Sequence, residues 1–316
     1  MTENAHRLVD TFSSAPLADH PSRWDQLYAQ SYHPWDRDGP SLALSDLLAQ
    51  RNDLIPSSAN SFFTQVTEYN SKRRRPTALV PGCGLGHDVL LLAARGYDVW
   101  GVDGSETAIE GARSREEAVA KRESSGELEE VLRVVGDGVE RGQVHWVKTD
   151  FFAPGWEKGL GTEGSGTFDL IFDYTVSFVI RYRHTGLESS LTHAFAQFLC
   201  ALPPEARPLW AKRTTGLLSH HANSRLICLE FPIGKPMSEG GPPWGLWPET
   251  YEALLAAPGE EIKYEEDGSG IPCAAAATRP QVEALHRLCL VKPNRTHSSG
   301  TAEDGSVKDF ISVWSR

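Results

Sequence analysis

A glycine-rich turn between an apolar strand and a helix constrains this chain more than any other feature. The segment reads LVPGCGLGHD, with Gly82, Gly84 and Gly86 after the apolar residues and Asp88 at the expected helix start. Glycines let a backbone approach a ligand closely, and the unpaired N–H groups of a helix start favour negative groups. The segment predicts a nucleotide-type ligand over the turn; the alternative is a tight strand-to-helix turn without a ligand.

Apolar segments elsewhere alternate with helical ones. We expect helices over 88–95, which Gly96 stops, and from Ser105, a residue type that favours the N-cap position. The alternation predicts an α/β fold with a doubly wound, mostly parallel sheet, in a single domain over 1–316. The final strand is expected to lie antiparallel at the sheet edge. The expected strands cover 77–84, 97–104, 143–152, 168–175, 224–234 and 309–316.

An acidic residue ends the second expected strand. Asp103 follows the glycines by about twenty residues, where a carboxylate can accept hydrogen bonds from both ribose hydroxyls of a nucleotide. NAD and S-adenosylmethionine both present such a ribose. The NAD fingerprint requires a third glycine three positions after the second, but His87 stands there and Gly86 precedes it. The spacing therefore favours S-adenosylmethionine, which has no pyrophosphate.

Two further acidic–aromatic pairs follow expected strands, where ligands of open α/β folds bind. In Asp150-Phe151 the acid can hydrogen-bond an adenine amine while the ring stacks on the base; the alternative is an N-cap aspartate beside a core phenylalanine. Asp173-Tyr174 ends a later strand, and its alternative is a buried tyrosine with a satisfied hydroxyl. Both pairs are expected at the carboxyl edge of the sheet.

Several segments in one order resemble the thiopurine methyltransferase superfamily and, within it, the plant and fungal thiol/halide methyltransferases. The resemblance runs from Trp24 to the final arginine and implies a Rossmann-like class I methyltransferase fold with a late antiparallel edge strand. It also implies S-adenosylmethionine as cofactor and no metal. The segments are LVPGCGLGHDVLLLAARGYDVWGVDGSETAI, TDFF, FDLIFDYT, FLCALPPEARPLWAKR and GPPWGLWPETYEALL.

In that family an N-terminal segment, here 1–75, folds over the cofactor with a W-x3-W-x6-PWD pattern. The run WDQLYAQSYHPWD matches it, except that a tyrosine takes the middle position. Aromatic faces stabilise a sulfonium by cation–π contact worth about 0.5–2 kcal/mol, although such rings can also simply cap a core. The resemblance implies Tyr174 and Trp35 as catalytic residues. The implied cofactor contacts are Trp24, Tyr28, Trp35, Gly82, Cys83, Gly84, Asp103, Asp150, Phe151 and Tyr174.

The resemblance implies methyl transfer to a small thiol, halide or pseudohalide. This chemistry requires no strong base, because a halide is already anionic and a thiol ionises near pH 8.5. Accordingly, the sequence shows no Ser/His/Asp or Cys/His catalytic set. Two alternatives remain: a nicotinamide-dependent oxidoreductase, and a non-catalytic binding protein on a methyltransferase-like scaffold.

The charge composition of the chain narrows the classes of binding partner that we expect. With 31 basic and 42 acidic residues, the net charge of −11 argues against nucleic acid and anionic membranes as partners. The basic run at 72–75 precedes a strand and is interpreted as a solvated strand entry. No signal peptide or membrane-length apolar stretch is visible, so a cytoplasmic protein with a small-molecule or anion substrate is expected. Nothing in the sequence indicates an oligomeric state.

The segment 176–197 interrupts the resemblance. Removing it joins FDLIFDYT to FLCALPP, a continuous family-like run, and the segment has neither a helical nor a strand period. The codons of its residues can contain the signals of an intron. Val176-Ser177 can contain a splice donor, Leu191-Thr192 a branch point and Gln197 a splice acceptor. We therefore predict a retained in-frame intron; the alternative is a genuine insertion that forms a loop or lid over the substrate pocket.

Overall fold

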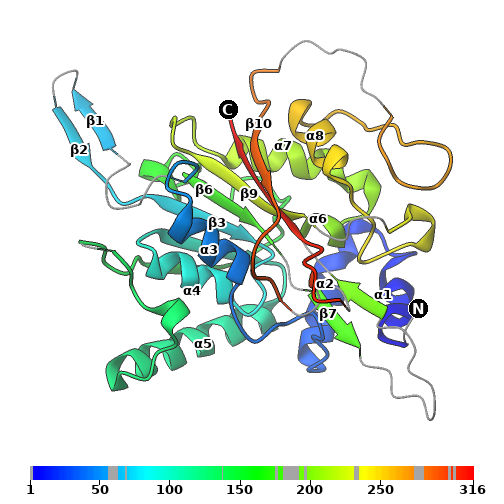
Figure 1. Ribbon diagram of the computed structural model, residues 1–316, viewed down its shortest axis with the longest axis horizontal. Coiled ribbons are helices and arrows are strands. Elements are labelled where there is room, and N and C mark those ends of the chain that lie inside the picture. The colour runs from blue at the N-terminus through cyan, green and yellow to red at the C-terminus, as the bar shows by residue number, and fades with distance from the viewer. Residues whose placement is uncertain are drawn as a thin grey trace.

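A seven-stranded sheet in the order β10-β11-β9-β6-β3-β4-β5 forms the centre of the molecule (Figure 1). The computed structural model describes residues 3–55, 63–67, 70–136, 138–174, 177–180, 192–195, 198–230, 235–273, 281–297, 300–301 and 304–316. The strands of the sheet are β3 (Thr77–Pro81), β4 (Asp98–Asp103), β5 (Val144–Lys148), β6 (Leu170–Asp173), β9 (Arg225–Glu230), β10 (His286–Val291) and β11 (Phe310–Ser315).

The direction of the strands confirms the predicted fold class. The strands β5, β4, β3, β6 and β9 pair in parallel, and β11 pairs antiparallel with β9 and with β10. The predicted late antiparallel strand is thus present at this side of the sheet, and β10, which was not predicted, lies outside it. The chain leaves β3 toward β4 and β5 and returns to β6 on the other side. Ligands of open α/β sheets bind at such a reversal.

Alternate residues of each strand face opposite layers, as the two-residue period of a strand requires. Ala78 and Val80 of β3 pack with α3 (Leu42–Gln50), α4 (His87–Ala94) and α5 (Glu106–Ser125). Leu79 packs on the other face with α6 (Phe198–Ala201), α7 (Arg207–Leu217) and α8 (Pro248–Ala256). Figure 1 shows these two helical layers on either side of the sheet. Burial on both faces explains why the strands are continuously apolar.

Both helices predicted after the first two strands are present. The Ser105 side chain caps α5 by accepting a hydrogen bond from the Ala108 N–H at 3.0 Å. The helix ends at Gly126, whose φ of 75° suits a residue without a Cβ. The other predicted helix, α4, begins at His87 after Gly86 at φ 79°. A side-chain cap therefore sets the start of α5, whereas α4 begins at a glycine in the left-handed region without a side-chain cap.

The N-terminal helices α1 (Glu3–Phe12) and α2 (His20–Ala29) form a third apolar cluster with the first turn of α5. Leu8, Phe12 and Leu27 are buried in it against Ala108. This packing holds α2 over the start of α5, beside the glycine turn. Short 3-10 helices lie at Leu17–Asp19, Glu130–Leu132, Thr162–Gly164, Pro204–Ala206 and Met237–Glu239.

Two hairpins stand apart from the central sheet. One pairs β1 (Phe63–Thr67) with β2 (Asn70–Arg73) and projects away from the sheet in Figure 1. The other pairs β7 (Ser177–Ile180) with β8 (Thr192–Phe195) inside the segment predicted to be a retained intron. The remaining residues of 176–197 lie outside the described part of the chain.

The basic run at 72–75 leads into β3, as predicted, but Arg74 is not solvated, because its side chain is only 14% exposed. Arg74 donates two hydrogen bonds to the buried Asp169, which also accepts one from the backbone of Thr77 at 2.9 Å. Arg75 pairs with Asp98 and Glu140. These two arginines stabilise the start of the strand. In the described residues, no helix combines the length and apolar character that a membrane crossing requires.

Candidate functional site

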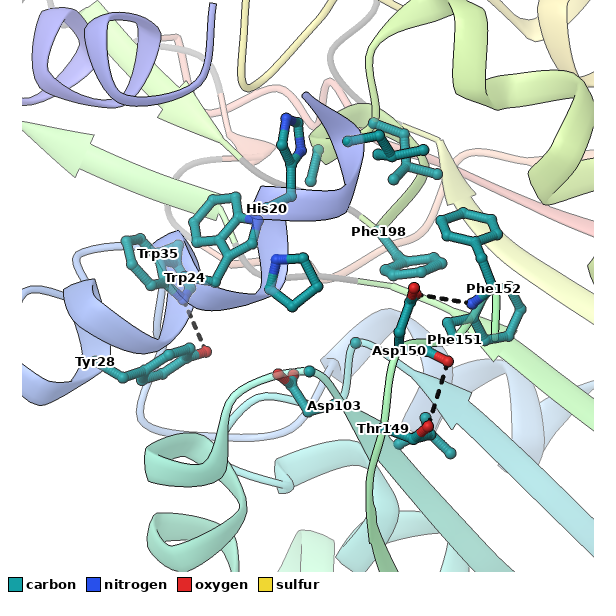
Figure 2. Close-up of a pocket in the computed structure, with 17 residues that line it drawn as sticks. His20, Trp24, Tyr28, Trp35, Asp103, Thr149, Asp150, Phe151, Phe152 and Phe198 are labelled. Carbon is teal, nitrogen blue, oxygen red and sulfur yellow. Dashed lines mark hydrogen bonds between the residues drawn. The ribbon is translucent and has the colours of Figure 1, made fainter. Parts of the chain in front are cut away.

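A pocket opens at the carboxyl ends of β3, β4 and β5, beneath α2 (Figure 2). Its lining includes predicted site residues from four separate parts of the chain. These are Trp24, Tyr28, Trp35, Gly82, Asp103, Asp150 and Phe151. The remaining lining residues are Leu17, His20, Pro21, Val102, Gly104, Thr149, Phe152, Phe198, Ala201 and Leu202.

The glycine turn forms the floor of the pocket. Gly82 and Gly84 have φ values of 60° and 52°, a region that other residues rarely adopt. A Cβ on Gly82 would lie 2.7 Å from Cδ2 of Phe198, and one on Gly84 would lie 2.8 Å from the Tyr28 hydroxyl. Side chains at these positions would therefore clash with the pocket walls, so both the conformation and the space require glycine.

Asp103 is held at the end of β4 by the backbone. Its Oδ2 accepts a hydrogen bond from the Gly84 N–H at 2.9 Å, and its Oδ1 accepts one from the Ser105 N–H at 2.8 Å. Burial raises the pKa of Asp103, while these two hydrogen bonds oppose the shift. Each carboxylate oxygen has a second lone pair. The carboxylate can therefore accept the two hydroxyls of a ribose without losing its orientation.

An aromatic wall covers one side of the pocket. Trp35 donates from Nε1 to the Tyr28 hydroxyl at 3.0 Å and meets Trp24 edge to face, with 5.0 Å between ring centroids. Trp35 is only 3% exposed and belongs to the N-terminal apolar cluster. These rings therefore line the pocket and also pack in the core.

The opposite wall carries the Asp150-Phe151 pair (Figure 2). Asp150 Oδ1 accepts a hydrogen bond from the Phe152 N–H at 2.9 Å, which fixes the turn after β5. Phe151 is buried and meets Phe198 edge to face at 5.0 Å. The arrangement places a carboxylate beside apolar rings.

Three predicted site residues are not part of this lining. Gly84 acts through its N–H to Asp103 and lies against Tyr28. Cys83 packs against the cluster that contains α4, and burial raises the pKa of its thiol well above the usual value. Tyr174, directly after β6, is 4% exposed and stacks on His297 at 6.2 Å between ring centroids. Tyr174 thus lies in the apolar cluster that contains α4, with the His297 ring beside it.

Several pocket residues were not predicted from the sequence. Phe152 adjoins the predicted Phe151, so its position after a strand was a usable signal. Phe198 lies beyond the interrupting segment, and His20 precedes the aromatic pattern, so neither belongs to a motif with a local signature. Their place in the lining depends on the packing of α6 and α2 over the sheet edge.

Asp173, beside Tyr174, is expected to make stability depend on pH. Its carboxyl accepts a hydrogen bond from Trp210 Nε1 at 2.6 Å, yet burial raises its pKa to about 7. The folded protein therefore keeps a proton on Asp173 that the unfolded chain loses above about pH 4. The contribution of this proton to the free energy of unfolding is complete at low pH and is lost as pH rises through 7. Asp173→Asn should stabilise the fold by on the order of 3 kcal/mol at pH 8 and by little at pH 4. Chemical denaturation at both values measures this, and equal differences at both would contradict it.

Comparison with known proteins gives a consistent result. The family model described as thiopurine S-methyltransferase matches residues 19–183. Thiocyanate methyltransferase 1 of Brassica oleracea is 33% identical over 211 residues, which cover 66% of this chain and 68% of that protein. The probable thiol methyltransferase 2 of Arabidopsis thaliana is 28% identical over 256 residues, which cover 81% of this chain and 78% of that protein.

Proposed function

Because the chain belongs to the thiopurine S-methyltransferase family and is therefore an S-adenosylmethionine-dependent methyltransferase, we propose that it methylates a small thiol, thiocyanate or halide. One observation supports this most: a single pocket unites the Asp103 carboxylate, the glycine turn and the aromatic wall. The two relatives, a thiocyanate methyltransferase and a probable thiol methyltransferase, support this acceptor class.

The pocket residues suit the parts of S-adenosylmethionine. We assign Asp103 to the ribose hydroxyls, and Asp150 with Phe151 to the adenine. The wall of Trp24, Tyr28 and Trp35 would face the sulfonium, where ring faces favour a cation. The two N–H groups that hold Asp103 keep its charge in place before the ligand binds. We assign Cys83 and Gly84 to the shape of the glycine turn on which the cofactor would lie.

Methyl transfer is an in-line displacement that breaks the bond from carbon to sulfur and forms the bond from carbon to the acceptor. Positive charge disappears from the sulfonium and negative charge disappears from the acceptor. A pocket with apolar aromatic walls favours such charge loss, and it also aligns the reactants. We assign Trp35 to the cover over the methyl group and Tyr174, from the adjoining region, to the acceptor side.

A panel of acceptors tests the proposal. The purified protein is incubated with S-adenosylmethionine and iodide, bromide, thiocyanate, hydrosulfide or an organic thiol, and the volatile methylated products and S-adenosylhomocysteine are measured. We expect product from at least one acceptor, in equal amounts with S-adenosylhomocysteine. Tight cofactor binding without product from any acceptor would support the alternative of a binding protein. Binding of NAD in place of S-adenosylmethionine would support the oxidoreductase.

A further inference from the structure

Two nitrogens of a partly buried guanidinium have no hydrogen-bond partner in the described part of the chain, two residues beyond the pocket residue Trp35. Arg37 follows Trp35 by two residues, and the buried Nε and Nη2 atoms of Arg37 have no hydrogen-bond partner in the described part of the chain. Burial lowers the pKa of Arg37 to about 10, although Tyr174, Asp309 and Asp36 oppose the shift electrostatically. Arg37 therefore remains charged at neutral pH, and the N–H groups of two of its nitrogens are unpaired.

The nearby carboxylates are engaged elsewhere. Asp36 accepts a hydrogen bond from His87, with Nε2 to Oδ1 at 3.1 Å. Asp309 accepts one from the Thr296 hydroxyl, and burial raises its pKa to about 6. Among the described residues, neither forms an ion pair with Arg37 within 4.0 Å. The negative charges of Asp36 and Asp309 oppose the effect of burial on the guanidinium, but the N–H groups on Nε and Nη2 stay unpaired.

Tyr174 and His297 complete the surroundings of Arg37. Their rings are parallel within 2°, and both interact electrostatically with the guanidinium. Burial and the charge of Arg37 lower the pKa of His297 to about 4, so its ring is neutral in the physiological range. The buried Nε2 of His297 also has no partner among the described residues. We name Arg37, Tyr174 and His297 the Arg37 cluster.

This cluster is linked through the chain and the sheet to residues that line or lead into the pocket. Trp35, which lines the pocket, is joined to Arg37 by Asp36 alone. Tyr174 follows β6, whose neighbour β3 leads into the glycine turn at Gly82. Arg37, Tyr174 and His297 are themselves outside the pocket lining, so the cluster is a separate group of side chains linked to the pocket by Trp35 and by β6.

Unsatisfied buried donors on a charged group are costly, and a compact anion relieves that cost by accepting their hydrogen bonds. We propose that the Arg37 cluster binds the anionic acceptor of the methyl transfer, with the guanidinium as the group that selects negative charge. This inference rests on the proposed function. The methionyl carboxylate of S-adenosylmethionine carries the same charge and is the other possible occupant.

Anion binding can be measured without turnover. The full chain is saturated with S-adenosylhomocysteine, and thiocyanate or iodide is titrated by calorimetry at constant ionic strength. Arg37→Gln should weaken the binding of either anion by about 10-fold to 100-fold, as expected for hydrogen bonds to a charged group. Arg37→Lys, which keeps the charge but not the fork of donors, should recover part of the loss. The affinity for S-adenosylhomocysteine should not change.

Arg122→Gln is the matched control. It removes the same charge from an exposed arginine near the end of α5 whose ion-pair partner is Glu129 rather than an acidic residue beside Arg37, and it should leave anion binding unchanged. Equal anion affinity in wild type and Arg37→Gln would overturn the inference, as would a wild type that binds neither anion. A loss confined to S-adenosylhomocysteine would assign Arg37 to the cofactor carboxylate instead. Anion binding without any methylated product would overturn the proposed function but leave the anion site standing.

Discussion

Asp103→Ala is expected to weaken S-adenosylmethionine binding by about 1.5–3 kcal/mol, which is about 10-fold to 150-fold in Kd. The carboxylate is the proposed acceptor for both ribose hydroxyls, and it also holds the N–H groups of Gly84 and Ser105. Its loss therefore removes ligand contacts and releases the turn. Calorimetric titration of the folded variant measures the effect.

A matched control for this variant lies on the same strand. Asp98 begins β4 and accepts a hydrogen bond from the Gln143 N–H at 2.8 Å, at the end of the strand opposite the pocket. Asp98→Asn should leave the cofactor Kd unchanged. If Asp103→Ala keeps both its fold and wild-type affinity, Asp103 has no ribose role and the assignment of the pocket to the cofactor loses its main support.

Deleting residues 176–197 is expected to give a protein at least as stable as the full chain and more active. The two flanks of the segment lie together, because the Leu199 backbone N–H interacts with the Asp173 carboxyl. Within the described residues, β7 and β8 pair only with each other and add nothing to the central sheet. A chain that leaves and returns at one place can be shortened at little cost. Denaturation and acceptor kinetics on both forms measure the outcome.

Two controls separate the possible reasons for a change. A variant with the same number of Gly and Ser residues in place of 176–197 shows whether length or sequence matters. A deletion variant that folds and binds cofactor but loses turnover would instead identify the segment as a working lid. Sequencing of the transcripts tests the origin of segment 176–197 separately. Transcripts that all encode VSFVIRYRH would refute the prediction of a retained intron.

The local sequence determined the central part of the pocket. Residues 77–126 contain a strand, a glycine turn, a helix, a second strand ending in Asp103, and a capped helix in one continuous run. Each of these elements depends on neighbours a few residues away: apolar runs, a Ser105 cap, glycines at positive φ. Such short-range rules are legible in sequence, so the floor of the pocket and its acidic residue could be predicted.

Only the tertiary structure decided which distant residues meet. The sequence alone did not show that Phe198 closes over Gly82, that β10 lies outside β11, or that Arg37 and His297 gather at Tyr174. Tyr174 was predicted as a cofactor contact, yet it lies outside the pocket lining and stacks on a histidine far along the chain. These contacts depend on how whole helices and strands pack their apolar faces. No short-range period in the sequence encodes that packing, because the hydrophobic effect is non-directional and stabilises contact with any apolar surface of complementary shape.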